Sequence, residues 1–284
     1  MKRFPCSAAF SLLALGTIPL LPMNSPAASA APERIGSAVF DFASLAVKPT
    51  ASGSRRDVVD ARTTTLERFE AHISTVRPGA NTHAPHRHAR EELFIVLEGS
   101  VDVHLNGRDT RVGPGSLVFA ASNDLHGVRN AGDTPATYYV FNFVTAATAR
   151  VDARPAIDYA GPDLLASHAF DWADLAVKPT KVGERRDVFD SRTLTCTQFE
   201  CHITTINPGE APHAPHRHPD EEMILVKEGT VEVTINGASQ HIGEGSLVFL
   251  GSNDEHGLRN VGDGRATYYV LRFSTEATPK VAAN

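Results

Sequence analysis

The chain has 284 residues, of which 42% are hydrophobic and 21% charged, and its formal net charge is -6. These values are typical of a soluble globular protein with one large core or two domains of ordinary size. A mildly acidic chain without a basic patch argues against nucleic acid as a partner, because phosphate binding needs clustered Lys and Arg.

The N-terminal segment has the pattern of a secretory signal. Lys2 and Arg3 precede an apolar run that ends near Leu21, and small residues lead to Ala28-Ser29-Ala30. The run is too short to span a bilayer comfortably, and the A-x-A ending is a cleavage pattern. We therefore expect a signal peptide at residues 1–30 and a periplasmic or secreted mature protein. The alternative is a disordered apolar tail.

The remainder of the chain is a duplication. A shift of 130 residues, which superimposes His86 on His216, aligns residues 40–148 with 170–278 without a gap. About 60% of the aligned positions are identical, far above chance for a fixed period. Each repeat exceeds 100 residues and can build its own core. We expect an N-terminal domain at 36–148, a linker at 149–167 and a C-terminal domain at 168–278.

Each repeat has the pattern of a β domain. In the first repeat, runs rich in Val, Ile, Phe and Tyr, several of them alternating polar with apolar residues, occur at 69–76, 93–105, 115–122 and 136–144. Turn signals such as Asn106-Gly107 separate them. No long segment has helical periodicity with caps. The fold class is therefore all-β, with two small barrels or sandwiches in tandem.

The cysteines are predicted to be unbridged. Cleavage of the signal would leave Cys196 and Cys201, which lie about 16 Å apart if one strand contains both. A disulfide needs Cα atoms within about 7 Å. The equivalent positions in the first repeat are apolar, Leu66 and Ala71. We expect two buried free thiols.

Histidines and a glutamate recur in both repeats at a spacing that suits a metal site. His86 and His88 are two residues apart and share one face of a strand, whereas Glu92 needs a turn to return beside them. His126 supplies a third imidazole from farther along the chain. Three imidazoles and one carboxylate that converge in a barrel make a site for a divalent transition metal. The second repeat has the same set at His216, His218, Glu222 and His256.

These motifs resemble those of the cupin superfamily. The segment Gly79-x6-His86-x-His88-x3-Glu92-x6-Gly99 looks like the first cupin motif, and Gly113-Pro114-Gly115 followed by His126-x3-Asn130 looks like the second. Both recur in the second repeat. Six residues rather than five separate the glycine from the first histidine, which affects loop shape rather than ligation. The resemblance implies a bicupin, two tandem jelly-roll barrels with a metal in each.

The ligand set constrains the chemistry. Four protein ligands leave two adjacent positions of an octahedral ion for water, O₂ or substrate, which favours Mn, Fe, Co or Ni over zinc. The resemblance implies an enzyme acting on a small oxygen-rich substrate. A quercetinase-like oxygenase is favoured over oxalate-decarboxylase-like chemistry because it requires fewer parts that the sequence lacks. A non-catalytic exported metal- or ligand-binding bicupin, or a metal-dependent hydrolase or isomerase, remains an alternative. A homo-oligomer through the cupin sheets is also expected.

Candidate catalytic groups flank the last histidine of each set. Asp124 and Asp254 are candidate general bases, although their Ser-Asn-Asp context also suits hydrogen bonding to the local backbone. Arg129, Arg259 and Arg272 are candidates for a positive charge over the substrate. Arg272 replaces Asn142 of the first repeat, so the two sites are expected to differ there.

The sequence also gives expectations for two further histidines and two further glutamates. His72 and His202 are candidates for orienting a ligand imidazole, and packing within the sheet is the alternative. Glu91 and Glu221, which precede the ligand glutamates, are expected to face solvent.

Overall fold

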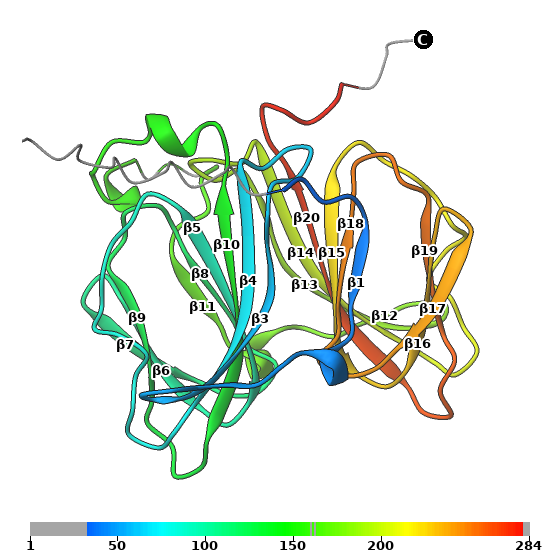
Figure 1. Cartoon of the computed structure of the whole chain (residues 1–284), viewed down its shortest axis with the longest axis horizontal. Helices are drawn as coiled ribbons and strands as arrows, with labels where there is room; N and C mark the ends of the chain where they lie inside the picture. The colour runs from blue at the N-terminus through cyan, green and yellow to red at the C-terminus, as the bar shows by residue number, and fades with distance from the viewer. Residues whose placement is uncertain (1–32, 160, 162, 281–284) are drawn as a thin grey trace, which may run out of the picture. The chain divides into compact units, whose positions relative to one another are not determined.

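The computed structural model describes residues 33–159, 161 and 163–280, so the predicted signal peptide lies outside the described residues. The described chain folds into two β barrels that lie side by side (Figure 1). It contains no helix that is long and apolar enough to cross a membrane. The predicted all-β class is confirmed. The short 3-10 helices are η1 (Phe42–Ser44), η2 (Thr148–Arg150), η3 (Ala156–Tyr159) and η4 (Trp172–Asp174).

The first barrel is a seven-stranded sheet closed by a three-stranded one. The large sheet has the order β11 (His168–Phe170), β8 (Leu117–Ala120), β5 (Glu91–Glu98), β10 (Ala136–Val144), β4 (Arg68–Val76), β3 (Gly53–Ala61) and β2 (Lys48–Thr50). The small sheet has the order β7 (Arg108–Val112), β6 (Val101–Leu105) and β9 (His126–Asn130).

The second barrel repeats this topology. Its large sheet has the order β1 (Ala38–Phe40), β18 (Leu247–Leu250), β15 (Glu221–Glu228), β20 (Ala266–Ser274), β14 (Gln198–Ile206), β13 (Gly183–Ser191) and β12 (Lys178–Pro179). Its small sheet has the order β17 (Ala238–Ile242), β16 (Val231–Ile235) and β19 (His256–Asn260).

The two repeats exchange their first strands. β1, from the start of the first repeat, pairs antiparallel with β18 of the second barrel, and Val39 faces Val248. β11, from the start of the second repeat, pairs in the same way with β8 of the first, and Ala169 faces Val118. The predicted boundaries 36–148 and 168–278 therefore separate the repeats in sequence, whereas each large sheet contains one strand from the other repeat.

Alternation along the central strands divides the apolar residues between two cores. On β10, Tyr138 and Val140 point into the first barrel, where they lie in one core with Phe94 of the neighbouring strand β5 and Val103 of the small sheet. Tyr139 and its alternate neighbours point the opposite way. β20 follows the same rule in the second barrel. Each large sheet is therefore buried on both faces.

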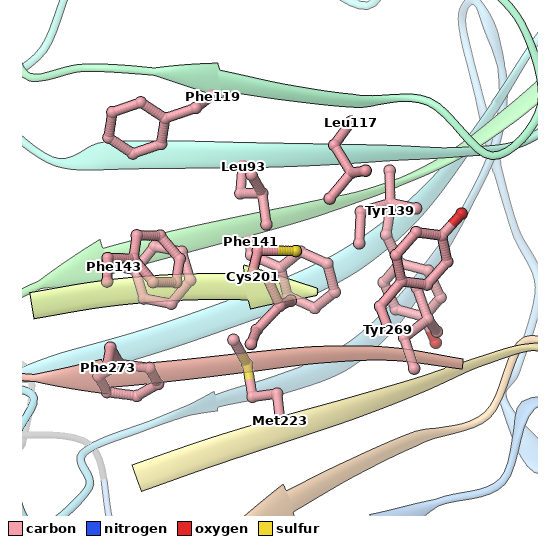
Figure 2. Close-up of a cluster of buried hydrophobic side chains, with 14 of the residues drawn as sticks. Leu93, Leu117, Phe119, Tyr139, Phe141, Phe143, Cys201, Met223, Tyr269 and Phe273 are labelled. Atoms are coloured by element: carbon pink, nitrogen blue, oxygen red, sulfur yellow. The ribbon is translucent and has the colours of Figure 1, made fainter. Parts of the chain in front are cut away.

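The outer faces of the two large sheets share one core between the barrels. Figure 2 shows aromatic residues of both repeats in it, among them Phe143 and Phe273, whose ring centroids are 5.6 Å apart. The Tyr139 hydroxyl donates to the Gly245 carbonyl at 2.7 Å. Cys201 lies in this core, and both it and Cys196 are buried and free, as predicted. The two large sheets thus pack against each other within this chain.

The hairpin between β6 and β7 confirms a local turn signal. Asn106 and Gly107 have positive φ angles of 49° and 88°, as expected of the two central residues of a type I′ turn. The hairpin holds the small sheet in register, from Val101 opposite Val112 to Leu105 opposite Arg108.

Candidate metal centres

Three imidazoles converge in the first barrel. The ring centroids of His86 and His88 are 5.0 Å apart, and each lies 4.7 Å from the ring of His126. One nitrogen from each ring lies within 4.8 Å of the other two. The Glu92 carboxylate joins them, with Oε1 at 3.1 Å from Nε2 of His88 and Oε2 at 3.1 Å from Nε2 of His126.

Local backbone pairing explains this convergence. His86 and His126 form an antiparallel bridge, with N–H to carbonyl distances of 2.9 and 3.0 Å, so both rings emerge side by side. The chain bends after His88 and returns as β5, whose interior face presents Glu92. The predicted turn between the second histidine and the glutamate is confirmed.

Backbone carbonyls fix the orientation of two of the imidazoles. Nδ1 of His88 lies 2.9 Å from the carbonyl oxygen of Arg90, and Nδ1 of His126 lies 2.8 Å from that of Asp124. A proton on each Nδ1 satisfies these contacts and leaves the Nε2 lone pairs facing the centre. Both Nε2 atoms are buried, and although each lies 3.1 Å from a Glu92 oxygen, neither forms a hydrogen bond of acceptable geometry with a described residue. Buried nitrogens of this kind are the vacant donors that a metal ion requires.

The charge state of the cluster also suits a cation. Burial and the neighbouring His126, His83 and His88 lower the pKa of His86 to about 4, so this ring is neutral at physiological pH. Burial alone would raise the pKa of Glu92, but His126 and His88 hold it well below its usual range. A neutral His86 imidazole beside the ionised carboxylate of Glu92 suits the binding of a divalent transition metal.

The second barrel repeats the centre with a looser carboxylate. The rings of His216, His218 and His256 have centroids 4.6 to 5.3 Å apart. Glu222 lies 3.3 Å from Nε2 of His218 but 3.9 Å from Nε2 of His256. Both of these Nε2 atoms are buried without a partner among the described residues. All eight predicted ligands therefore gather in two groups of four.

Each centre lies at the wall of a cavity, and the cavities differ. The first has a volume of about 570 Å³ and the second about 400 Å³. In the first, Nε of Arg90 donates to Asn142 Oδ1 at 2.5 Å. Asp220 replaces Arg90 in the second repeat, and Arg272 replaces Asn142. Arg90, just before β5, is thus particular to the first cavity, and Arg272, on β20, is particular to the second.

The cupin domain profile matches residues 72–142 and again 202–272, which together make up half of the chain. The chain belongs to the cupin family. Two matched domains in tandem make it a bicupin. No curated protein sequence matches this bicupin significantly.

Solved structures of two-barrel cupins are similar to the bicupin in fold. AerE from Microcystis aeruginosa is 16% identical, with a TM-score of 0.60 over 82% of this chain and 98% of its own. Oxalate decarboxylase from Lactobacillus farciminis, solved as a formate complex, is 16% identical, with a TM-score of 0.62 over 85% and 87%. A variant of the Bacillus subtilis oxalate decarboxylase OxdC is 15% identical, with a TM-score of 0.61 over 85% and 78%. These similarities establish the fold.

The predicted catalytic residues occupy different places in the bicupin. Arg272 lines the second cavity. Arg129 and Arg259 are exposed on the small sheets and line neither cavity. The carboxylates of Asp124 and Asp254, which also lie outside the cavity walls, accept hydrogen bonds of 2.6 Å from the hydroxyls of Ser167 and Ser37 in turn. Of the five, only Arg272 is therefore positioned to meet a substrate.

His72 and His202 face the cavities but do not orient a ligand imidazole. Nδ1 of His72 lies 2.8 Å from Glu70 Oε1, and Nδ1 of His202 lies 2.7 Å from Glu200 Oε1. The sequence contained this signal, because the glutamates precede the histidines by two residues and share their face of the strand.

The expectation that Glu91 and Glu221 face solvent is wrong. Their exposed fractions are 1% and 0%. Glu91 accepts hydrogen bonds from the hydroxyls of Thr193 and Thr195, at 2.7 and 2.6 Å, and from the Leu194 amide at 3.1 Å. Alternation with the inward-facing Glu92 does place Glu91 on the outer face of the sheet, but the other repeat covers that face.

The mirror-image contact joins the two repeats in the opposite direction. Glu221 accepts hydrogen bonds from the hydroxyls of Thr63 and Thr65, at 2.6 and 2.5 Å, and from the Thr64 amide at 2.9 Å. We call these two glutamates with their threonine loops the inter-barrel clasps. Burial raises the pKa of each glutamate, and the threonine donors oppose that shift.

Proposed function

We propose that the bicupin is a metal-dependent enzyme that acts on a small oxygen-rich substrate. The observation that carries this proposal is the set of buried imidazole nitrogens beside a cavity that form no hydrogen bond with the described residues. In each barrel three histidines and one glutamate would hold one ion of Mn, Fe, Co or Ni. A bound ion of this kind supplies Lewis acidity or O₂ activation. The protein orients the ligands through backbone carbonyls and admits the substrate through the cavity.

The first cavity favours a quercetinase-like oxygenase reaction. Its volume of about 570 Å³ exceeds the needs of a two-carbon acid, and Phe94, Tyr138 and Val140 give it an apolar wall. The guanidinium groups at its edge are engaged, since Arg90 binds Asn142 and Arg68 binds Asp60 at 2.7 Å. A planar, largely uncharged substrate with several oxygens fits this lining better than a small anion.

The second cavity favours a different candidate, decarboxylation of a small acid. It is smaller, and Arg272 contributes a guanidinium that forms no ion pair with the described residues. Arginine binds carboxylates in a bidentate fashion. The similar fold of the oxalate decarboxylases is compatible with this reading. The non-catalytic alternative is a bicupin that retains such an acid without converting it.

Metal analysis of purified full-length protein, prepared without chelators, is the first test. We expect about two equivalents of Mn, Fe, Co or Ni per chain, and the loss of about one each in His86→Ala and His216→Ala. His104→Ala is the matched control, because this histidine pairs with Asp109 at 2.7 Å on the small sheet, away from both cavities. Protein that takes up no metal even after reconstitution would contradict the ligand assignment.

Activity assays separate the candidate reactions. Oxygen uptake with the flavonol quercetin that is lost in His86→Ala supports the oxygenase at the first site. Release of CO₂ from oxalate that is lost in His216→Ala supports the decarboxylase at the second. Retention of either compound by the metal-loaded protein without turnover identifies the non-catalytic binder.

We also propose that the enzyme works outside the cytoplasm. The basic, apolar and A-x-A pattern of residues 1–30 supports export. N-terminal sequencing of protein expressed from the whole gene tests this, and a mature chain that begins near Ala31 is the expected result. A mature chain that retains the apolar segment would contradict it.

A further inference from the structure

A histidine–glutamate pair faces each metal centre from the opposite part of the cavity wall. His72 and Glu70 lie on β4, and His202 and Glu200 lie on β14. Within each pair, Nδ1 of the histidine lies within hydrogen-bond distance of the carboxylate, at 2.8 and 2.7 Å. All four side chains are 8 to 15% exposed and line the cavities. The proposed metal chemistry does not use them.

Strand register places the pair at a defined distance from the metal ligands. Asn142 on β10 lies opposite Glu92 on one side and opposite Glu70 on the other. Val140 separates Phe94 from His72 in the same way. The pair is thus two strand spacings, about 10 Å, from the ligand glutamate. A small substrate bound at the metal centre can reach the pair across this gap. The pair is too far away to contact a ligand imidazole directly.

Glu70 is held as an acceptor by three neighbours. It accepts hydrogen bonds from Arg55 at 2.8 Å and from the Asn142 amide at 2.6 Å, besides that from His72. Burial would raise the pKa of Glu70, but His72, Asn142 and Arg55 hold it below its usual value. An ionised carboxylate accepts the Nδ1 proton of the imidazole, so the Nε2 lone pair is left free.

A second histidine–carboxylate pair in the same barrel shows the difference. His104 also places Nδ1 near a carboxylate, at 2.7 Å from Asp109, but its Nε2 accepts the Gly107 amide at 3.2 Å. No described residue hydrogen-bonds Nε2 of His72, which lines the cavity. Nε2 of His104 is occupied by a backbone amide, whereas Nε2 of His72 is available to a ligand.

We propose that His72 is a catalytic residue whose Nε2 takes a proton from the bound substrate, and that Glu70 is its positioning residue. His202 and Glu200 have the same roles at the second centre. This proposal rests on the proposed function, because it requires a substrate that is held at the metal. The substrate must then carry a hydroxyl or acid proton close to the atoms that bind the metal, so that His72 can reach this proton.

The step balances without a further reagent. An O–H bond of the substrate breaks, its electron pair stays on the substrate oxygen, and the proton forms an N–H bond at Nε2 of His72. Nδ1 keeps its own proton, and the new positive charge is balanced by Glu70. The proton returns to the product or to water after turnover, so the pair is regenerated and nothing is oxidised in this step.

Anaerobic binding of quercetin followed by absorption spectroscopy tests the proton transfer. Metal-loaded wild-type protein is expected to bind quercetin with the red-shifted spectrum of its deprotonated form. His72→Gln/His202→Gln is expected to keep its metal and to bind quercetin in the protonated form, with turnover lower by about 10²- to 10⁴-fold. Glu70→Gln is expected to lower turnover by about 10- to 100-fold with little change in KM. His104→Gln is expected to behave as wild type.

The remaining outcomes distinguish a failure of the role proposed for His72 from a failure of the proposed oxygenase function. Turnover in the double variant within twofold of wild type, or loss of its metal, overturns the role of His72. Wild-type protein that neither binds nor converts quercetin contradicts the oxygenase function instead. In that case ring-nitrogen NMR shifts of the resting protein still test the pair. A proton on Nδ1 and a free Nε2 support it, a proton on Nε2 overturns it, and Glu70→Gln is expected to mix the two tautomers.

Discussion

Ser167 donates a hydrogen bond of 2.6 Å to Asp124, two residues before the metal ligand His126. The same hydroxyl oxygen accepts the Ala121 amide at 2.8 Å. The backbone carbonyl oxygen of Asp124 in turn accepts a hydrogen bond from Nδ1 of His126. Because Ser167 immediately precedes the exchanged strand β11, the second repeat supports the loop that presents a metal ligand of the first.

Removal of this hydroxyl is therefore expected to weaken metal binding in the opposite repeat. In Ser167→Ala the buried Asp124 carboxylate loses the only hydrogen bond that the described residues give it. We expect a loss of about 1 to 3 kcal/mol in the free energy of unfolding and faster chelator-driven release of one ion, that of the first barrel. Metal release followed by absorption with a chromogenic chelator measures it.

The matched variant is Ser37→Ala, because Ser37 donates to Asp254 at 2.6 Å in the second barrel. Ser37→Ala is expected to speed metal release from the second centre alone. Combining it with His86→Ala, which removes the ion of the first centre, makes the second centre the one observed. Equal effects of either serine on both centres would contradict support across the repeats.

The inter-barrel clasps are expected to contribute strongly to stability. In Thr193→Val/Thr195→Val, the buried carboxylate of Glu91 keeps one of its three donors, the Leu194 amide. We expect the free energy of unfolding to fall by about 3 kcal/mol, because a buried acceptor loses two hydrogen bonds. Urea denaturation of metal-free protein measures this.

A surface threonine provides the control for the clasp. Thr234→Val removes a hydroxyl that lies 2.8 Å from Ser239 Oγ at an exposed site of β16, and it is expected to change stability by less than about 0.5 kcal/mol. If the clasp variant were as stable as this control, Glu91 would not join the barrels energetically.

Arg272 is expected to select the ligand of the second cavity. In Arg272→Asn, which copies the residue of the first repeat, affinity of the metal-loaded protein for oxalate should fall by about tenfold or more, because a charge-assisted pair is lost. Arg265→Asn removes an exposed arginine that pairs with Glu184 at 3.1 Å and is the control. Isothermal titration calorimetry measures both. Unchanged oxalate binding in Arg272→Asn would contradict the anion site.

Acid stability provides a prediction that is independent of the metal. Lys48 and Arg55 lower the pKa of Asp57 from 3.8 to about 2, so the folded carboxyl is more acidic than the unfolded one. This stabilisation is present above pH 3.8 and is lost as the pH falls towards 2. Because Asp57 is half exposed, we expect a contribution below about 1 kcal/mol.

The measurement is urea denaturation of metal-free protein at pH 6 and pH 2.5. Asp57→Asn is expected to lower the stability at the higher pH and to leave it nearly unchanged at the lower. The equivalent Asp187, with its pKa lowered to about 2 by Lys178 and Arg185, gives an independent repeat of the experiment. A variant that is equally destabilised at both values would show that packing, and not charge, is lost.

Features encoded by short spacing could be predicted from the sequence. The two-residue interval of His86 and His88, the turn before Glu92 and the Asn106-Gly107 hairpin depend on contacts within a few residues. The exchange of β1 and β11 depends instead on which barrel accepts a three-residue strand. Because Val39 and Ala169 are both apolar and occupy equivalent positions of the two repeats, the sequence pattern does not distinguish which edge each strand joins.

The same limit explains why the burial of Glu91 was not predicted. The alternation of β5 fixes which face each residue occupies, but not what covers that face. For Glu91 the cover is the other barrel. Asp124 lies in the loop before β9, where its hydrogen bond comes from the segment before the exchanged strand. Long-range packing of this kind leaves no local periodicity, whereas Arg272 was identifiable because it differs between otherwise matching repeats.

The strand exchange makes each barrel dependent on a strand from the other repeat. A single repeat without its partner would leave the β8 or β18 edge of its large sheet unpaired. Its clasp glutamate would lose its threonine donors, and the apolar outer face of the sheet would be exposed. Both features favour aggregation. Each repeat therefore supports the fold of the other, whatever chemistry its own cavity performs. The lining of one cavity can differ from that of the other while both barrels keep their fold, as Asn142 and Arg272 at equivalent positions illustrate.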